Sequence, residues 1–220
     1  MKNDRHLLAL SFWSVSFHYL RLVENVARET ISQGNIWTMT REFTEEGISV
    51  DEYSEATRWS DHSIIIALIF NLLHGIELLV KGYILWDPAE TIKKRHNTSD
   101  LCSKFRNKYP DQNTLYRFFN RYTNDDCAPD LFRHFRIDNG INIREFYEAF
   151  RYPSPDFSAM HNYISLKYNG EQGLVFFREL AKSIPEARVA AIALCRALEN
   201  DEGQQGGPGY PPQGVGSPDP

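Results

Sequence analysis

Cysteine is scarce in this sequence, and the few cysteines are scattered. Only three of the 220 residues are cysteine, namely Cys102, Cys127 and Cys195, and no two of them form a CxxC pair. An odd, scattered count argues against a disulfide framework and fits a reducing compartment. No cluster of cysteine and histidine has the spacing of zinc ligands. We therefore expect a cytoplasmic protein that holds no metal ion and no other cofactor.

The sequence also lacks the short motifs of several large enzyme classes. It has no GxxxxGK(S/T) phosphate-binding loop, no GxGxxG dinucleotide-binding turn, no HExxH zinc-protease helix and no GxSxG nucleophile elbow. These absences exclude the common forms of those sites. Function has to be inferred from less specific patterns.

Neither of the two long apolar stretches is typical of a membrane or export signal. Residues 7–17 follow two basic residues, but no small-residue cleavage site comes after them. Residues 63–86 are strongly apolar, yet three ionisable side chains lie in their middle. A membrane-spanning helix has about 20 apolar residues with few or no charges, so a buried helix of a soluble protein is the better interpretation. We expect no membrane contact.

The size and charge of the chain suit one globular domain. Hydrophobic residues make up 42% and charged residues 24% of the 220 positions, which is ordinary for a soluble domain. The formal net charge is -5, but residues 93–151 hold 12 basic and 8 acidic residues, or +4. A basic middle in an acidic chain permits an anionic partner without being a strong nucleic-acid signature.

Helical periodicity dominates, so the predicted fold class is all-α. In residues 7–32 apolar side chains recur every three or four positions, which predicts a helix with one stripe facing a core. That stripe consists of Leu10, Trp13, Phe17, Leu20, Val23 and Val26. Gly34 stands where a helix C-terminus is expected.

A long central helix is predicted over residues 49–86. Ser49 and Glu52 have the S-x-x-E spacing of a capping box, and no breaker follows until Asp87-Pro88. At about 1.5 Å per residue this helix would be about 54 Å long. Its second half is apolar on nearly every side, so it should be the centre of an up-down helical bundle.

The sequence after residue 88 predicts shorter helices. Helices are expected over residues 99–108, 114–122 and 143–150. Residues 163–177, around Asn169-Gly170, suggest either a small β-hairpin or a loop leading into a helix from about Gln172. A second S-x-x-E box at Ser183 predicts the start of a final helix. We therefore expect one domain over residues 1–200 and a disordered Gly/Pro-rich tail over 201–220.

The best candidate site lies on the central helix. Four polar residues are spaced by three, three and four positions and fall within one arc of roughly 120° on an otherwise apolar helix. They are Asn71, His74, Glu77 and Lys81. This polar stripe predicts either a binding cleft or a satisfied buried network, with Glu77 and Lys81 paired at i,i+4.

Two basic segments could supply cations to the same site. Lys93-Lys94-Arg95-His96 precedes a predicted helix, where a phosphate would be favoured. Arg151, followed by Tyr152 and Pro153, lies at a predicted turn, where its guanidinium could bind a phosphate or pair with Glu77. Either segment could also be an ordinary solvated surface.

Three sequence segments together resemble the HEPN superfamily, a group of helical nucleotide-binding domains. The first is the helix segment Asn71-Leu-Leu-His-Gly-Ile-Glu77-Leu-Leu-Val-Lys81-Gly-Tyr, which is similar to the family's ExxLKxxL helix. The second is His96-Asn-Thr-Ser-Asp-Leu101, which is similar to the motif at the start of the next helix. The third is Phe150-Arg151-Tyr152-Pro153, which is similar to an RYP segment of many small members. The resemblance covers roughly residues 50–160 and the last helices.

The resemblance implies a compact helical bundle, often dimeric, connected with nucleotide binding, RNA cleavage or defence and toxin systems. Active ribonucleases of the family carry Arg, four to six residues, then His, and no arginine here has that spacing. We therefore expect a non-catalytic homodimeric module that binds a nucleotide, RNA or a partner protein in a groove. Its expected lining is Asn71, His74, Glu77, Lys81, Arg95, His96, Arg151 and Tyr152. A divergent metal-independent ribonuclease and a structural or regulatory subunit of a larger complex are the alternatives.

Overall fold

The computed structural model describes residues 2–36, 49–90, 98–152, 154 and 160–205. In this part of the chain all regular structure is helical, with eight α-helices, two short 3-10 helices and no strand, which confirms the predicted all-α class. The α-helices are α1 (Lys2–Ser32), α2 (Val50–Thr57), α3 (Asp61–Trp86), α4 (Thr98–Lys108), α5 (Asn113–Thr123), α6 (Asp130–Asn139), α7 (Ile143–Arg151) and α8 (Gly170–Gln205). The 3-10 helices are η1 (Asp125–Cys127) and η2 (Ile164–Leu166).

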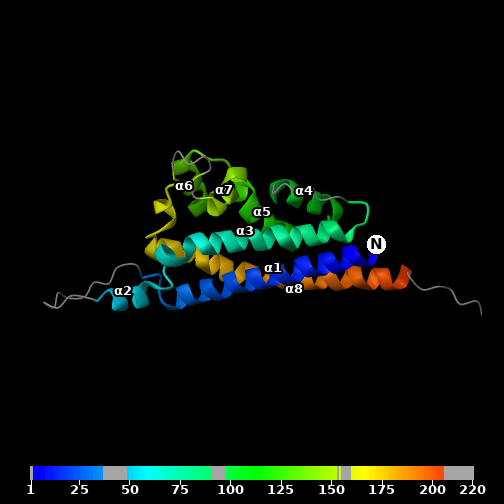
Figure 1. Ribbon diagram of the computed structural model, residues 1–220, viewed down its shortest axis with the longest axis horizontal. Coiled ribbons are helices and arrows are strands. Elements are labelled where there is room, and N and C mark those ends of the chain that lie inside the picture. Colours follow the sequence, from blue (N-terminus) through cyan, green and yellow to red (C-terminus); the bar gives the residue numbers. More distant parts are fainter. Residues whose placement is uncertain (1, 37–48, 91–97, 153, 155–159, 206–220) are drawn as a thin grey trace, which may run out of the picture.

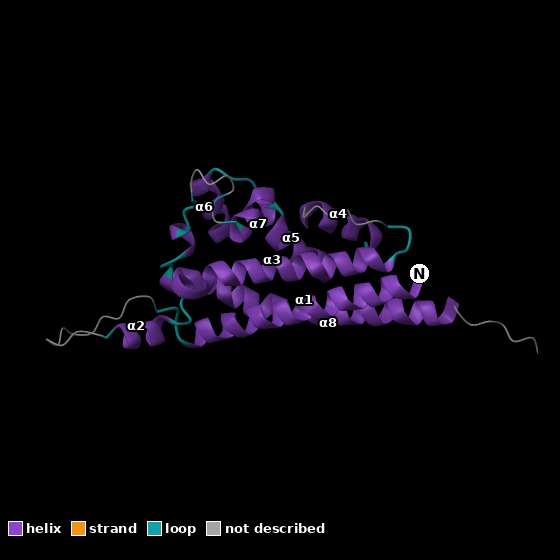
Figure 2. Cartoon of the chain, viewed as in Figure 1, coloured by secondary structure: helices purple, strands orange, loops and turns teal. Residues whose placement is uncertain are grey.

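Three long helices form one layer and four short helices form another (Figures 1 and 2). Helix α1 runs antiparallel to both α3 and α8 and contacts both of them. Helices α4 to α7 cover the opposite side of α3, so α3 is the helix of the long layer that the second layer packs against. This position makes α3 the central helix that its apolar composition predicts.

Helix α1 ends where the sequence predicts, but its buried row differs from the predicted one. Gly34 has φ +77°, and the amides of Gly34 and Asn35 donate to the carbonyls of Ile31 and Thr30, which is the Schellman pattern. Leu10 was expected in the core and is 37% exposed. The buried row consists of Ala9, Trp13, Ser16, Leu20, Val23, Ala27 and Thr30. Small residues within this row let α1 approach α3 closely.

The predicted single helix over 49–86 is wrong, because the chain breaks between α2 and α3. The capping box at Ser49 is confirmed. At the break, the amide and the hydroxyl of Ser60 both donate to the carbonyl of Thr57, and the Asp61 amide donates to Asn35 Oδ1 at 2.7 Å. These hydrogen bonds satisfy backbone groups that a continuous helix would use, so α3 has 26 residues and is about 39 Å long.

Burial within the bundle explains the apolar length of α3. Among the described residues it is the one helix long and apolar enough to cross a membrane, and more than half of its most apolar window is buried inside the chain. The core helix of a soluble protein passes the same test. This finding fits the predicted buried central helix.

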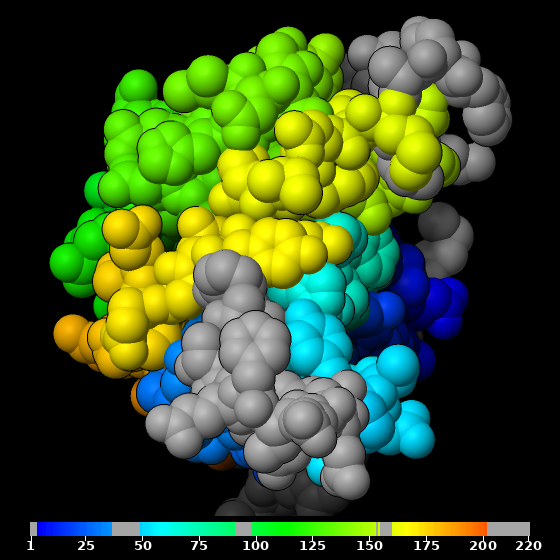
Figure 3. Space-filling view, turned by 90° about the vertical axis from the view of Figure 1, so that its left-hand side faces the viewer, coloured from blue at the N-terminus to red at the C-terminus, as the bar shows by residue number. Residues whose placement is uncertain are grey.

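Residues 163–177 form no β-hairpin. Residues 164–166 are the 3-10 helix η2, and α8 begins at Gly170. The alternative prediction, a loop leading into a helix, is the correct one. The chain turns here because the amides of Tyr168 and Asn169 donate to the buried carboxylate of Asp61 at 2.9 and 2.8 Å. Figure 3 shows η2 and the start of α8, in yellow, lying directly against the cyan start of α3.

Helix α8 does not begin at Ser183, as the second S-x-x-E box predicts, but runs through Pro185 without interruption. The Ser183 hydroxyl shares a hydrogen bond with Tyr122 instead of capping a helix. Proline has no amide to donate to the carbonyl of Ala181, and Arg28 of α1 donates to that carbonyl at 3.2 Å. Helix α8 also continues to Gln205, beyond the predicted tail boundary at residue 201, and residues 206–220 lie outside the described residues.

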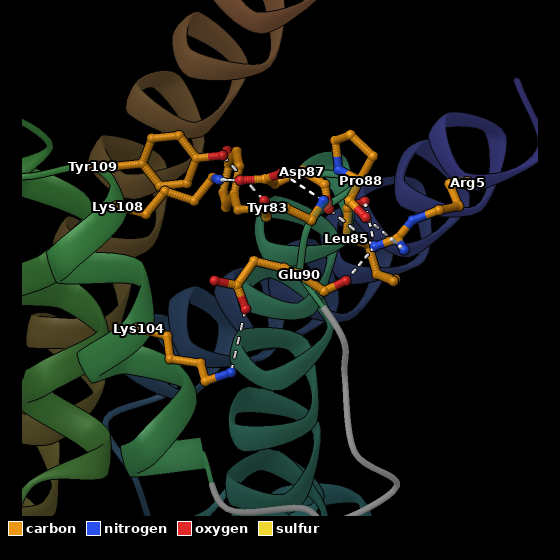
Figure 4. A network of polar contacts seen from close by, with 10 residues as sticks. Arg5, Tyr83, Leu85, Asp87, Pro88, Glu90, Lys104, Lys108 and Tyr109 are labelled. Carbon is orange, nitrogen blue, oxygen red and sulfur yellow. Dashed lines mark hydrogen bonds and ion pairs between the residues drawn. The ribbon is translucent and has the colours of Figure 1, made fainter. Parts of the chain in front are cut away.

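Basic side chains bind the oxygen atoms at the C-terminal end of α3 (Figure 4). The guanidinium of Arg5 donates to carbonyl oxygens of this segment, including those of Asp87 at 3.0 Å and Glu90 at 2.6 Å. Lys108 of α4 pairs with the Asp87 carboxylate. Hydrogen bonds to Lys108 and to the Ala89 amide lower the pKa of Asp87. Positive charge at a helix C-terminus complements the helix dipole, so these contacts join α1 and α4 to the same end of α3.

We expect Gly82→Ala to destabilise the fold. A Cβ atom at Gly82 would lie 2.4 Å from Trp13 Cδ1 and 3.2 Å from the Ala9 carbonyl oxygen. Overpacking of this kind costs about 1–3 kcal/mol, which outweighs the helix propensity gained from alanine. Urea denaturation of the full chain measures the change. If the clash with Trp13 is the cause, the loss is smaller in a Trp13→Phe background, and an equally large loss there would contradict the explanation.

We expect Asp61→Ala to lower the free energy of unfolding by more than about 3 kcal/mol. The substitution leaves two backbone amides and the Asn35 amide without their acceptor, and each hydrogen bond to a charged group contributes about 1.5–3 kcal/mol. The control is Glu171→Ala on the exposed start of α8, which should change stability by less than about 0.5 kcal/mol. Equal losses in the two variants would show that Asp61 does not hold this end together.

Candidate functional site

Three of the four predicted polar residues on α3 meet one another. The Lys81 ammonium pairs with Glu77 Oε1, and His74 Nδ1 lies 3.8 Å from Glu77 Oε2. The Glu77 side chain is 1% exposed, Lys81 is 11% exposed and His74 is 28% exposed. Asn71 does not join them, because its amide donates to the Ala67 carbonyl on its own helix at 2.8 Å. The row therefore runs from a buried ion pair to a half-exposed histidine.

Tyr147 of α7 completes this network. Its hydroxyl shares a 2.8 Å hydrogen bond with His74 Nδ1. Burial raises the pKa of Tyr147 well above its usual value, the charge of Glu77 and a hydrogen bond to it raise the pKa further, and Arg151 opposes the shift. Tyr147 thus stays protonated at neutral pH, and its hydroxyl lies between His74 and Glu77 and shares a hydrogen bond with each.

Aromatic rings enclose His74 on two further sides. The ring of Phe70 stacks on the imidazole with centroids 5.6 Å apart, and the ring of Tyr19 from α1 meets it edge-on at 4.9 Å. The polar stripe gave no sign of Tyr19, Phe70 and Tyr147, since none of them belongs to it. Tyr147 did have a signal, because it precedes Arg151 by four residues and so shares its face of α7.

Arg151 lies at the outer edge of the same cluster. Its guanidinium carbon is 5.7 Å from the centre of the Tyr147 ring and 5.5 Å from that of Tyr152. Tyr152 is 51% exposed. Among the described residues no carboxylate pairs with Arg151 and no acceptor bonds its guanidinium. The structure thus brings Arg151 and Tyr152 next to the His74–Tyr147 pair.

The inner part of the network is closed to ligands. Behind Tyr147 there is a cavity of only about 20 Å³, lined by Leu73, Thr98, Tyr122 and neighbouring residues. That volume holds about one water molecule. This space is too small for a nucleotide.

A larger cleft opens beside Tyr152. It has a volume of about 660 Å³, and its lining includes Arg144, Glu148, Tyr152 and His161. The cleft is large enough for a nucleoside or a short side-chain segment of a partner. His74, Tyr147 and Arg151 do not line this cleft, and Tyr152, on which Arg151 lies, connects it to the cluster.

The two remaining predicted site residues are not among the described residues. Arg95 and His96 belong to residues 91–97, which lie outside the described part of the chain, as do the neighbouring Lys93 and Lys94. The candidate site therefore consists of His74, Glu77, Lys81, Tyr147, Arg151 and Tyr152.

The described residues support neither metal-ion chemistry nor nucleophilic chemistry of Cys102 and Cys195. No group of three or more His, Cys, Asp or Glu side chains in the described ranges could hold a metal ion. Burial raises the pKa of Cys102 to about 12 and that of Cys195 to about 11, so both thiols stay protonated at neutral pH and are poor nucleophiles.

Comparison of the chain with family models, with curated proteins and with solved structures gives no match. Function therefore has to be inferred from the arrangement of the site itself.

We expect the buried Glu77–Lys81 pair to contribute to the free energy of unfolding. Removing one partner of a buried pair typically costs about 3–5 kcal/mol, because the other charge stays buried without compensation. We expect Lys81→Met to show such a loss, and the double variant Glu77→Gln/Lys81→Met to be more stable than Lys81→Met alone. Urea denaturation of the single and double variants measures the coupling. Additive losses would mean that the two side chains do not stabilise each other.

Proposed function

We propose that this chain is a HEPN-like, non-catalytic helical module that binds a nucleotide or RNA through phosphate. The observation that supports the proposal most is the guanidinium of Arg151, which pairs with no carboxylate among the described residues and lies over the ring of Tyr147, whose hydroxyl meets His74. A planar guanidinium matches the geometry of phosphate oxygens, and a nearby imidazole adds a further donor.

Aromatic side chains around the cation favour a ligand that carries bases. Unpaired bases are commonly held by stacking on aromatic rings and by arginine on the phosphate. Tyr152 is half exposed against Arg151, and the adjoining cleft of about 660 Å³ has room for a base. The basic middle of the chain, +4 over residues 93–151, supports the same class of anionic ligand.

The buried ion pair has a positioning role in this proposal. Glu77 and Lys81 neutralise each other, so the carboxylate adds little repulsion toward a phosphate at Arg151. Tyr147 connects this pair to His74 and supports the Arg151 side chain with its ring. We expect this binding to take place in the cytoplasm, because all three cysteines are unpaired thiols.

Fluorescence anisotropy with a labelled single-stranded RNA oligonucleotide tests the proposal, with ATP as a competing nucleotide. We expect Arg151→Met to weaken RNA binding by at least about tenfold, because a hydrogen bond to a charged group contributes about 1.5–3 kcal/mol. The matched control is Arg133→Met, which removes the same charge from an exposed position on α6. RNA binding that is absent in the parent chain, or equal in the two variants, would contradict the proposal.

One observation favours a second candidate, a divergent ribonuclease. His74 is oriented by Tyr147 and lies 3.8 Å from a carboxylate, and a histidine held in this way can act as a general base. Incubation of the RNA with purified parent chain and with His74→Gln decides between the candidates. Cleavage by the parent that is lost in His74→Gln would establish the ribonuclease. Intact RNA with both proteins would support the binding module.

A further inference from the structure

The hydroxyl of Tyr147 fixes which nitrogen of the His74 ring carries the proton. This hydroxyl shares hydrogen bonds with His74 Nδ1 and with Glu77, and it has only one proton to donate. The carboxylate of Glu77 is ionised in its pair with Lys81 and can only accept. The Tyr147 proton therefore points at Glu77, and the Tyr147 oxygen accepts from His74 Nδ1. A neutral His74 then has its proton on Nδ1 and a lone pair on Nε2.

Nε2 is the nitrogen of this ring that reaches solvent. It forms no hydrogen bond with a described residue, and it is not one of the buried polar atoms that lack a partner. The His74 side chain as a whole is 28% exposed, although Phe70 stacks on its ring and Tyr19 meets it edge-on. The neutral ring therefore presents an unprotonated nitrogen to solvent from a fixed position.

A nitrogen held in this way is an activated nucleophile. In covalent catalysis a nucleophile is typically activated by a hydrogen-bonded neighbour, which a third group orients in turn. Here His74 Nδ1 donates to Tyr147, and Tyr147 donates to Glu77. Glu77 Oε2 also lies 3.8 Å from Nδ1, so its negative charge stabilises the positive charge that the ring gains when Nε2 forms a bond.

We propose that His74 Nε2 is a phosphoryl acceptor that is modified by a small acyl phosphate. The lone pair of Nε2 attacks the phosphorus atom, an N–P bond forms, and the bond from phosphorus to the acyl oxygen breaks. The electron pair of the broken bond leaves with the carboxylate, which is weakly basic and needs no acid to protonate it. No base is needed either, because Nδ1 keeps its proton. The product is an Nε2-phosphohistidine whose positively charged ring lies beside Glu77.

The surroundings of His74 favour a phosphoryl group over other electrophiles. Phosphoryl transfer depends mainly on positioning and on positive charge near the phosphoryl oxygens. The guanidinium of Arg151 lies over the ring of Tyr147, and Lys81 pairs with Glu77, so the cluster contains two cations. Because aromatic rings enclose the imidazole on two sides, a small donor reaches Nε2 with the least obstruction. This modification goes beyond the binding of RNA and does not depend on it.

Incubation of the full chain with acetyl phosphate in mildly alkaline buffer, where imidazoles are neutral, tests the proposal. We expect the mass of one phosphoryl group to be added, to be lost in acid and retained in base, and to map to His74. His74→Gln should gain none, and Tyr147→Phe should react at least about tenfold more slowly, because Nδ1 loses its acceptor. The matched control is His134→Gln, at an exposed position on α6, which should react like the parent. An unmodified parent, or equal modification of the parent and His74→Gln, would overturn the proposal.

The tautomer of His74 can be measured in the parent chain, so this second test does not depend on the folding of any variant. Nuclear magnetic resonance correlations of the ring nitrogens distinguish a protonated nitrogen from an unprotonated one. We expect neutral His74 to be protonated on Nδ1 and unprotonated on Nε2. A neutral His74 with its proton on Nε2 would also overturn the proposal, because that nitrogen would then have no lone pair for the attack.

Discussion

The carboxylate of Asp61 is 1% exposed, and both of its oxygens accept hydrogen bonds from backbone more than one hundred residues away. Asn35, which follows α1, both accepts from the Asp61 amide and donates to its carboxylate. One side chain thereby fixes the end of α1, the start of α3 and the start of α8. Burying a carboxylate is costly unless its oxygens are hydrogen-bonded, so the three long helices come together here in one geometry.

The rest of the bundle follows from this fixed end. With α3 held between α1 and α8 on one side and α4 to α7 on the other, its polar residues have to find partners within the protein. Glu77 forms an ion pair with Lys81, and His74 shares a hydrogen bond with Tyr147. Among the described residues, the guanidinium of Arg151 at the end of α7 has only aromatic rings as partners. The site is therefore a buried neutral pair with a cation at its rim.

Local signals predicted local structure well, and long-range contacts account for the errors. The capping box at Ser49 and the C-terminal glycine of α1 act within a few residues, and both form as expected. The break before Asp61 and the turn at Tyr168 depend on each other across the chain, which no periodicity reveals. Pro185 is tolerated inside α8 because Arg28 supplies the missing donor. The polar stripe on α3 predicted the centre of the site, but its aromatic surroundings come from other helices.

The two indole rings at the junction of α1 and α3 have a spectroscopic consequence. Trp13 and Trp86 stack with centroids 5.1 Å apart and an interplanar angle of 21°. Chromophores this close couple their electronic transitions, and the coupling vanishes when the helices separate. Near-ultraviolet circular dichroism therefore includes a contribution from this contact beside those of the other aromatic side chains, while the far-ultraviolet signal reports on helix content. The native chain thus carries an intrinsic optical probe for the separation of α1 from α3, without any attached dye.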